Sequence, residues 1–280
     1  MGLPGWHLHW DVWLVIGGLY AAYLLAWRAR GKTVPPAQDP HRRRKIALFS
    51  VGVGLLLLGA DWPVHDLSED YLFSVHMFQH LLFSLVGPAF ILAGVPDWMA
   101  RALLRPAWLR HGWRFVTRPL LAFIIFNGFL LLSHWPAFVN ASVSSELFHL
   151  GAHVALFGAS IVMWWPVLSP LPEMPPISRP AQMVYLFLMS LAPTVPASFL
   201  TFGESPMYHA YEAFPRIWGI SAIDDQRMAG LLMKLAGGFI LWGMITAIFF
   251  KWHAEEERND GWDALKVQDV DREVTTEVTR

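Results

Sequence analysis

Cysteine is absent from the 280-residue sequence. Its absence excludes disulfides, thiolate metal sites and thiol nucleophiles, so imidazole, thioether and carboxylate groups remain as metal ligands. Charged residues are also scarce, at 15% of the chain against 55% hydrophobic residues and a mean hydropathy of +0.38. Soluble domains are less apolar than this, so the sequence indicates a protein of the lipid bilayer with no nucleic-acid partner.

Long apolar runs of about 15 to 24 residues recur along the chain, close to the roughly 20 residues that cross a hydrocarbon core about 30 Å thick. We therefore predict an all-α, polytopic membrane protein, with a seven-transmembrane-helix bundle formed by residues 1–252. The predicted spans are 11–27, 46–60, 71–94, 119–135, 146–167, 181–202 and 226–250. Residues 253–280 form a charged tail, which we expect to be disordered or a weak surface helix.

Basic residues divide unevenly among the connections between these spans. Segments 28–45, 101–118, 169–180 and 251–280 hold 18 of the 21 Lys and Arg, whereas the alternate connections hold two. Because Lys and Arg favour cytoplasmic loops, we predict that the N-terminus lies outside and the C-terminal tail lies in the cytoplasm.

Two of the apolar runs carry a pair of histidines near their start. His76 and His80 lie in YLFSVHMFQHLLFSLVGPAFILAG, and His149 and His153 lie in ELFHLGAHVALFGASIVMWW. Residues four apart share one helix face, so each pair can approach a single metal ion. Both runs point inward, which places all four imidazoles roughly 5 to 15 Å below the outer boundary. Since polar groups inside a membrane usually mark a site, we predict that the four histidines converge on one metal, a metal pair or a cofactor.

Other candidate ligands are expected at a similar level. Asp225, at the start of the seventh run, is included with the four histidines as a metal ligand. Additional candidates are Asp224, Met228, Met233, His134, Asp61 and Lys234. Each has a structural alternative, such as packing for methionine, a hydrogen-bonded core position for His134 and pairing with an acid for Lys234. An imidazole-rich site with thioethers and no thiolate suits copper, with zinc and iron as alternatives.

Three stretches, HMFQHLLFSLVGPAFILAGVP, ELFHLGAHVALFGASIVMWWPV and DDQRMAGLLMK, resemble the CtaG family of cytochrome c oxidase assembly factors. The resemblance extends from about residue 10 to residue 252. It implies a multi-pass protein of the bacterial plasma (inner) membrane that is needed to make an active haem-copper oxidase and handles copper on the outer, periplasmic side. The residues that match the family motifs are His76, His80, His149, His153, Asp225, Gln226, Gly230 and Met233.

The leading hypothesis is therefore a non-enzymatic assembly factor that holds copper and passes it to an oxidase. Its expected partners are oxidase subunits or other copper chaperones, and a homo-oligomer is left open. One alternative is a membrane metalloenzyme with a dinuclear His/Asp centre. Others are a haem or quinone protein, with one axial histidine from each helix, and a copper permease. Which of Asp224 and Asp225 faces the site is also left open.

Overall fold

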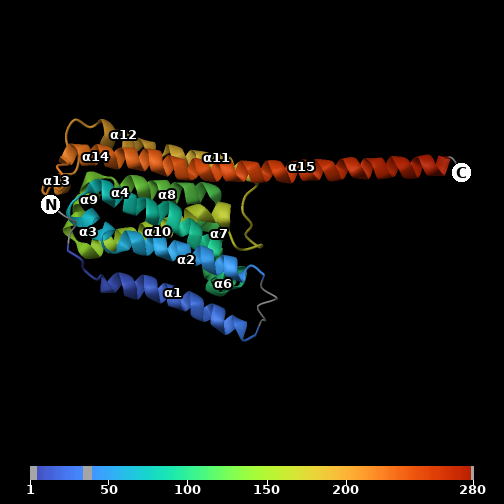
Figure 1. The fold of residues 1–280 in the computed structure, drawn as a ribbon, viewed down its shortest axis with the longest axis horizontal. Coiled ribbons are helices and arrows are strands. Elements are labelled where there is room, and N and C mark those ends of the chain that lie inside the picture. Colours follow the sequence, from blue (N-terminus) through green and yellow to red (C-terminus); the bar gives the residue numbers. More distant parts are fainter. Residues whose placement is uncertain (1–4, 34–39, 279–280) are drawn as a thin grey trace.

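The computed structural model describes residues 5–33 and 40–278, with side chains as far as Arg258. Within these ranges the chain is helical and contains no strand. Figure 1 shows the elements side by side along one direction, with several short helices at one end. The elements are α1 (Trp10–Gly31), α2 (Arg42–Ala60), α3 (Val64–Asp70), α4 (Phe73–Leu81), η2 (Leu82–Val86), α5 (Gly87–Gly94), α6 (Asp97–Leu103), α7 (Ala107–Val116), α8 (Pro119–Ser133), α9 (Pro136–Ser144), α10 (Glu146–Leu168), α11 (Arg179–Leu191), α12 (Thr194–Phe202), α13 (His209–Glu212), α14 (Ala222–Leu231), η3 (Leu232–Ala236) and α15 (Gly237–Val278).

Six helical segments of the described chain are long and apolar enough to cross a membrane. They are Trp10–Gly31, Arg42–Asp70, Phe73–Gly94, Glu146–Leu168, Arg179–Phe202 and Ala222–Arg258. A seventh span is reached if α7 and α8, which meet at 77°, are counted together. The predicted all-α, polytopic membrane fold is confirmed, with six to seven spans.

The segment Phe73–Gly94, made of α4, η2 and α5, is the central span. Of the apolar 18-residue stretch in this span, 67% is buried inside the protein, whereas the same share is 11–33% in the other candidate spans. Helix α2 packs closely along α5 because glycine occupies the contact positions. A Cβ added at Gly94 would lie 2.5 Å from the backbone nitrogen of Phe49, and one added at Gly52 would lie 2.6 Å from Ile91 Cγ1. No larger side chain fits there without moving the backbone.

A π-helical turn, η2, interrupts the central span just after His80. Pro88 follows it and has no N–H with which to bond the carbonyl of Ser84 four residues earlier. The indole of Trp164 on α10 donates to this Ser84 oxygen instead, at 3.3 Å. A second π-helical turn, η3, contains Met233 and Lys234. Such turns are frequent at functional sites.

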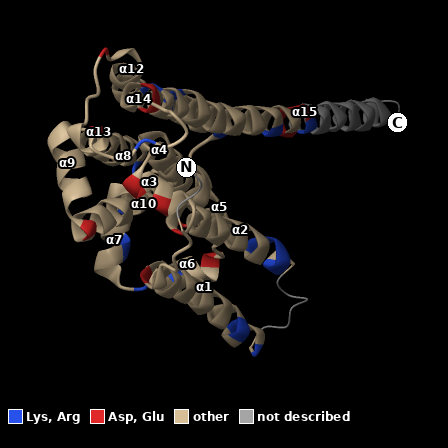
Figure 2. Cartoon of the chain, turned by 60° about the vertical axis from the view of Figure 1, so that its left-hand side comes forward, with Lys and Arg blue, Asp and Glu red and all other residues tan. Residues whose placement is uncertain are grey.

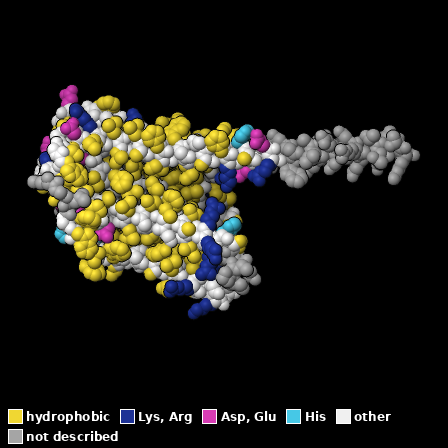
Figure 3. Space-filling model, viewed as in Figure 1, with side chains coloured by type: hydrophobic (Ala, Val, Ile, Leu, Met, Phe, Trp, Pro, Cys, Tyr) yellow, Lys and Arg dark blue, Asp and Glu magenta, His cyan; other side chains and the backbone are white. Residues whose placement is uncertain are grey.

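The outside of the bundle is apolar between two polar ends. Large hydrophobic side chains such as Leu120, Val184 and Phe239 are exposed, and Figure 3 shows them covering the face between the ends. Figure 2 shows a group of Lys and Arg around the end of α1 and the start of α2, whereas acidic residues near α3 and at α14 lie at the other end. This separation agrees with the charge pattern of the sequence, and the N-out orientation stays a prediction.

Helix α15 continues past the last span to Val278, and in Figure 1 it extends beyond the other helices. The sequence predicts that the charged tail is either disordered or a weak surface helix, and the described part of the tail is helical. The division into a transmembrane domain and a cytoplasmic tail stays a prediction.

Candidate metal centre

Contacts at the helix starts determine where the paired histidines lie. Helix α10 begins after Ser145, whose hydroxyl accepts the N–H of Phe148 at 3.3 Å, an N-cap that satisfies one of the free donors of the first turn. Helix α4 receives its cap from another helix, because the carboxylate of Asp225 on α14 accepts the N–H groups of Phe73 at 2.7 Å and Ser74 at 2.9 Å. The histidines of both pairs therefore lie within the first turns of firmly capped helices.

The four imidazoles lie together between α4 and α10. Within each helix the ring centres are 4.3 Å apart, for His76 with His80 and for His149 with His153. Between the helices they are 5.3 to 5.6 Å apart. One ring nitrogen from each of His76, His149 and His153 lies within 4.8 Å of the other two. The histidines converge, as their spacing and depth predict, and metal binding by them stays a prediction.

Glu69 on α3 orients one of these rings. Its Oε2 lies 2.7 Å from Nδ1 of His149, whose Nε2 lies 3.1 Å from Nε2 of His153. A carboxylate that accepts the Nδ1–H of an imidazole fixes the tautomer, leaves Nε2 free to bind a metal and makes it more basic. The arrangement is the one that supports a metal-binding histidine.

His134 lies beside the cluster, at the end of α8, with its ring 6.3 Å from that of His80. Its Nδ1 lies 2.7 Å from the carbonyl oxygen of Leu130 and so carries the proton. Its Nε2 is buried and has no hydrogen-bond partner among the described residues. The same holds for Nδ1 of His76. Buried polar atoms are rarely left unpaired, so these nitrogens indicate room for a ligand.

Two adjoining cavities meet at the histidines. The outer cavity, about 30 Å³, is lined by Glu69, Tyr211 and all five histidines named above. The deeper cavity, about 50 Å³, shares His80 and His134 with the first and is lined by four methionines, Met77, Met163, Met189 and Met233. One of these thioethers is held in place, because the side-chain amide of Asn127 donates to Met189 Sδ at 3.2 Å.

Residues 18–255 match the family model described as cytochrome c oxidase caa3 assembly factor (Caa3_CtaG). The chain belongs to this family. The match includes both histidine pairs and the motif at the start of α14, and it agrees with the resemblance in the sequence. No curated protein and no solved structure was found to match the chain.

In this CtaG-family protein, the paired acids of α14 lie outside the histidine cluster. Both oxygens of Asp225 accept backbone N–H groups of α4, and the side chain is 1% exposed. Asp224 is exposed and closes the first turn of its own helix through Ser221, whose hydroxyl donates to its Oδ2 at 2.6 Å. Asp225 is thus the buried one of the two acids, and its carboxylate points to the start of α4 rather than to the imidazoles. Metal binding by either acid stays a prediction.

The rest of the family motif on α14 serves helix packing. Oε1 of Gln226 accepts the N–H of Met207 at 2.6 Å, and its amide donates to the carbonyl of Leu200 at 3.2 Å. A Cβ added at Gly230 would lie 2.4 Å from Thr201 Oγ1. These contacts bind α14 to α12 and to the loop between α12 and α13. The position of α14 in turn holds Asp225 against α4.

The remaining candidate residues are dispersed. Asp61, at the end of α2, accepts a hydrogen bond from the indole of Trp13 at 2.8 Å. Met228 is 48% exposed on the surface of α14. Lys234 lines the deeper cavity together with Met233. Of the additional candidates, His134 thus lies beside the histidine cluster, and Met233 and Lys234 line the deeper cavity. The candidates that lie outside both cavities are Asp61, Asp224, Asp225 and Met228.

Two residues of the outer cavity, Glu69 and Tyr211, were not selected by sequence reasoning. Glu69 has a signal in the sequence: it follows His65 by four residues, so the two side chains share a helix face just before the first histidine pair. Tyr211 offers no such signal. Burial raises the pKa of the Tyr211 hydroxyl, and the carboxylates of Glu69 and Asp225 raise it further, so the phenol stays protonated beside the cluster.

Proposed function

We propose that this CtaG-family protein binds copper at the histidine cluster and passes it to a cytochrome c oxidase during assembly. The observation that carries the proposal is the meeting of His76, His149 and His153, with ligand nitrogens within 4.8 Å of one another. His80 lies next to them, one helical turn from His76. Three or four imidazoles with a carboxylate behind one of them suit a first-row transition metal.

The methionines below the histidines favour copper over zinc and iron. Thioether sulfur is a soft ligand that selects Cu(I), whereas zinc and iron sites of this kind use imidazole and carboxylate. Four methionine side chains line one cavity that also reaches His80 and His134. An ion could therefore exchange imidazole for thioether ligands in small steps, as transfer to a partner requires.

The alternatives receive less support from the same geometry. A haem would need space between two axial histidines, but the imidazole rings of the two helices are only 5.3 to 5.6 Å apart and the cavity there is about 30 Å³. A dinuclear His/Asp centre would need a carboxylate ligand, and both oxygens of Asp225 already accept backbone hydrogen bonds. Glu69 is the carboxylate available to the cluster.

Copper would be handled on the outer side of the plasma membrane. Helices α4 and α10, which carry the histidines near their starts, directly follow α3 and α9 in the chain. Figure 1 shows α3 and α9 at one end of the bundle, and in Figure 2 Lys and Arg gather at the other end, around the end of α1 and the start of α2. The positive-inside bias favours a cytoplasmic position for that basic end, so the histidines would face the periplasmic side, where an oxidase subunit or another copper chaperone could accept the ion.

The test is the copper content of the purified full-length protein. His76→Ala/His149→Ala should retain the fold and lose the copper held by the histidine cluster, since two of the ligand nitrogens are gone while the apolar spans are unchanged. His209→Ala is the matched control, because His209 is exposed and its ring pairs with Glu212 at 2.9 Å, outside the cluster. Cells that carry the double variant should also lose oxidase activity, and added copper should restore part of it by mass action.

Equal copper in the wild type and the double variant would contradict the proposal. Met233→Leu tests the choice of metal, with the exposed Met228→Leu as its control. The first should weaken binding of Cu(I) and leave binding of Zn²⁺ unchanged, because only the soft ion gains from the thioether. An equal effect on both metals would contradict copper as the preferred ion.

A further inference from the structure

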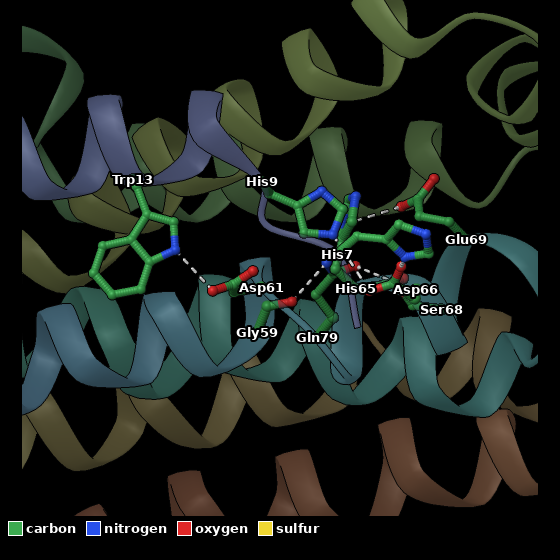
Figure 4. Close-up of polar contacts among 10 residues, drawn as sticks. All are labelled: His7, His9, Trp13, Gly59, Asp61, His65, Asp66, Ser68, Glu69 and Gln79. Atoms are coloured by element: carbon green, nitrogen blue, oxygen red, sulfur yellow. Dashed lines mark hydrogen bonds and ion pairs between the residues drawn. The ribbon is translucent and has the colours of Figure 1, made fainter. Parts of the chain in front are cut away.

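A second group of histidines lies on the outer side of the cluster, where the N-terminal segment crosses the end of α2 and the short helix α3 (Figure 4). The hydrogen bond from Trp13 to Asp61 fixes the start of α1 against the end of α2. His7 and His9 precede α1 and extend over α3. The segment is therefore held in a defined place.

Asp66 of α3 is the centre of this group. Its side chain is only 8% exposed, and its two oxygens face two different imidazoles, His7 Nδ1 at 3.4 Å and His9 Nε2 at 3.3 Å. The ring of His65 lies edge-on to that of His9, with 4.5 Å between their centres. Asp66 and these three imidazoles thus lie close together, and carboxylate and imidazole groups are ligands of transition-metal cations. Their ligand atoms do not meet within 4.8 Å as those of His76, His149 and His153 do, so the side chains would close on an ion as it binds.

Glu69 connects this group to the inner cluster. Its Oε1 lies 4.0 Å from Nδ1 of His65, and its Oε2 lies 2.7 Å from Nδ1 of His149. Both Nδ1 of His65 and Oε1 of Glu69 are buried and lack a hydrogen-bond partner among the described residues. Buried polar atoms are rarely left without a hydrogen bond, so these two atoms are candidates to contact a further ligand.

The outer group is also accessible and set in a field that attracts cations. The side chain of His7 is 68% exposed, whereas that of His149 is 11% exposed. Residues 1–27 and 46–100 contain no Lys or Arg, and four acids lie within residues 61–70. Such a one-sided charge distribution raises the local concentration of cations.

We propose that His7, His9, His65 and Asp66 form a second metal site, which takes up a copper ion from the outside and passes it through Glu69 to His149 of the inner cluster. This loading site rests on the proposed copper function of the inner cluster. The transfer is an exchange of ligands on one ion, and it needs no redox partner.

The experiment follows copper binding by the purified full-length protein in detergent, with copper as the only added metal. The variant is His7→Gln/His9→Gln, and Asp66→Asn is a second, nearly isosteric variant. His209→Gln is the matched control, an exposed histidine beside a carboxylate outside the group. Copper per chain is measured at saturation, and the rate of loading is measured by rapid mixing. Each variant of the loading site should bind one copper ion fewer than the wild type and fill the inner cluster about tenfold more slowly, while the control is unchanged.

A purely structural role for these residues would change thermal stability without changing copper stoichiometry or the rate of loading, and that result would overturn the loading site. The inner cluster is judged separately with His76→Ala/His149→Ala. If that variant loses copper while His7→Gln/His9→Gln binds as the wild type does, the loading site is wrong and the proposed function stands. If only His7→Gln/His9→Gln loses copper, the inner cluster does not bind copper. Both the proposed function and the transfer of copper to the inner cluster are then wrong.

Discussion

Glu69 is the residue on which both groups of histidines depend, because its two oxygens face rings from different helices. It lies at the end of a short helix of seven residues, α3, which the hydrogen bond from Ser68 to Gln79 at 3.2 Å fastens to the central span. Gln79 in turn donates to the carbonyl of Gly59 on α2 at 2.8 Å. The position of the carboxylate is thus set by packing around a wholly buried amide.

Glu69→Gln should weaken copper binding by about 10- to 100-fold, since the neutral amide is a poorer acceptor for the Nδ1–H of His149 and no longer makes Nε2 more basic. Competition with a copper chelator measures the affinity. Glu212→Gln is the control, because Glu212 forms the same kind of pair with the exposed His209. An unchanged affinity would mean that Glu69 does not support the metal.

Asp225→Ala should destabilise the protein, because it leaves the buried N–H groups of Phe73 and Ser74 unpaired, at a cost of about 1–3 kcal/mol for each unsatisfied group. Asp224→Ala, at the exposed neighbour, should cost less, about 1 kcal/mol at most, because it removes one exposed hydrogen bond from the Ser221 hydroxyl and leaves intact the cap that Ser221 provides to the backbone N–H of residue 224. Unfolding in mixed micelles gives both free energies. Loss of copper with unchanged stability in Asp225→Ala would instead identify Asp225 as a ligand.

At the scale of elements, the arrangement of the site depends on close contacts between helices at glycine. Gly230 lets α14 approach α12 so closely that an added Cβ would lie 2.4 Å from Thr201 Oγ1 and 2.8 Å from the carbonyl of Ala197. Helix α14 carries Asp225, which caps α4, and α4 carries His76 and His80. The family motif on α14 therefore acts on the histidines through the position of α4.

Gly230→Ala should lower the free energy of unfolding by about 1–3 kcal/mol, as expected for overpacking. Gly243→Ala is the matched control, because nothing lies within 4 Å of a Cβ there, and alanine should stabilise the helix by about 0.5–1 kcal/mol. Thermal unfolding of both variants in detergent measures the difference. Equal stability of the two would show that the contact between α12 and α14 is looser than the structure has it.

At the scale of the whole molecule, charge separates the two ends of the bundle. We predict that the C-terminus is cytoplasmic, because the connections on that side hold 18 of the 21 Lys and Arg and basic loops are retained in the cytoplasm. A fluorescent protein fused after residue 280 should fold and emit, and a fused alkaline phosphatase should be inactive. An active phosphatase would reverse the orientation and place the histidine cluster on the cytoplasmic side.

The sequence by itself determined the class of fold and the pairing of the histidines. Apolar runs of span length leave few alternatives to transmembrane helices, and the four-residue spacing of His76 with His80 and of His149 with His153 determines that each pair shares a helix face. The equal depth of the two pairs also follows from the sequence, because both lie near the start of spans that run in the same direction.

Only the tertiary structure decided which other residues lie beside the four histidines. Asp225 has the chemistry of a ligand, but the packing of α14 against α4 turns its carboxylate to the backbone of Phe73 and Ser74. Glu69 and the methionines Met77, Met163 and Met189 come from four different helical segments, so only the packing of these segments brings them together around the two cavities. Periodicity specifies the face of one helix, whereas the neighbours of that face depend on the rotation and approach of other helices, which small residues such as Gly52, Gly94 and Gly230 determine through close contact.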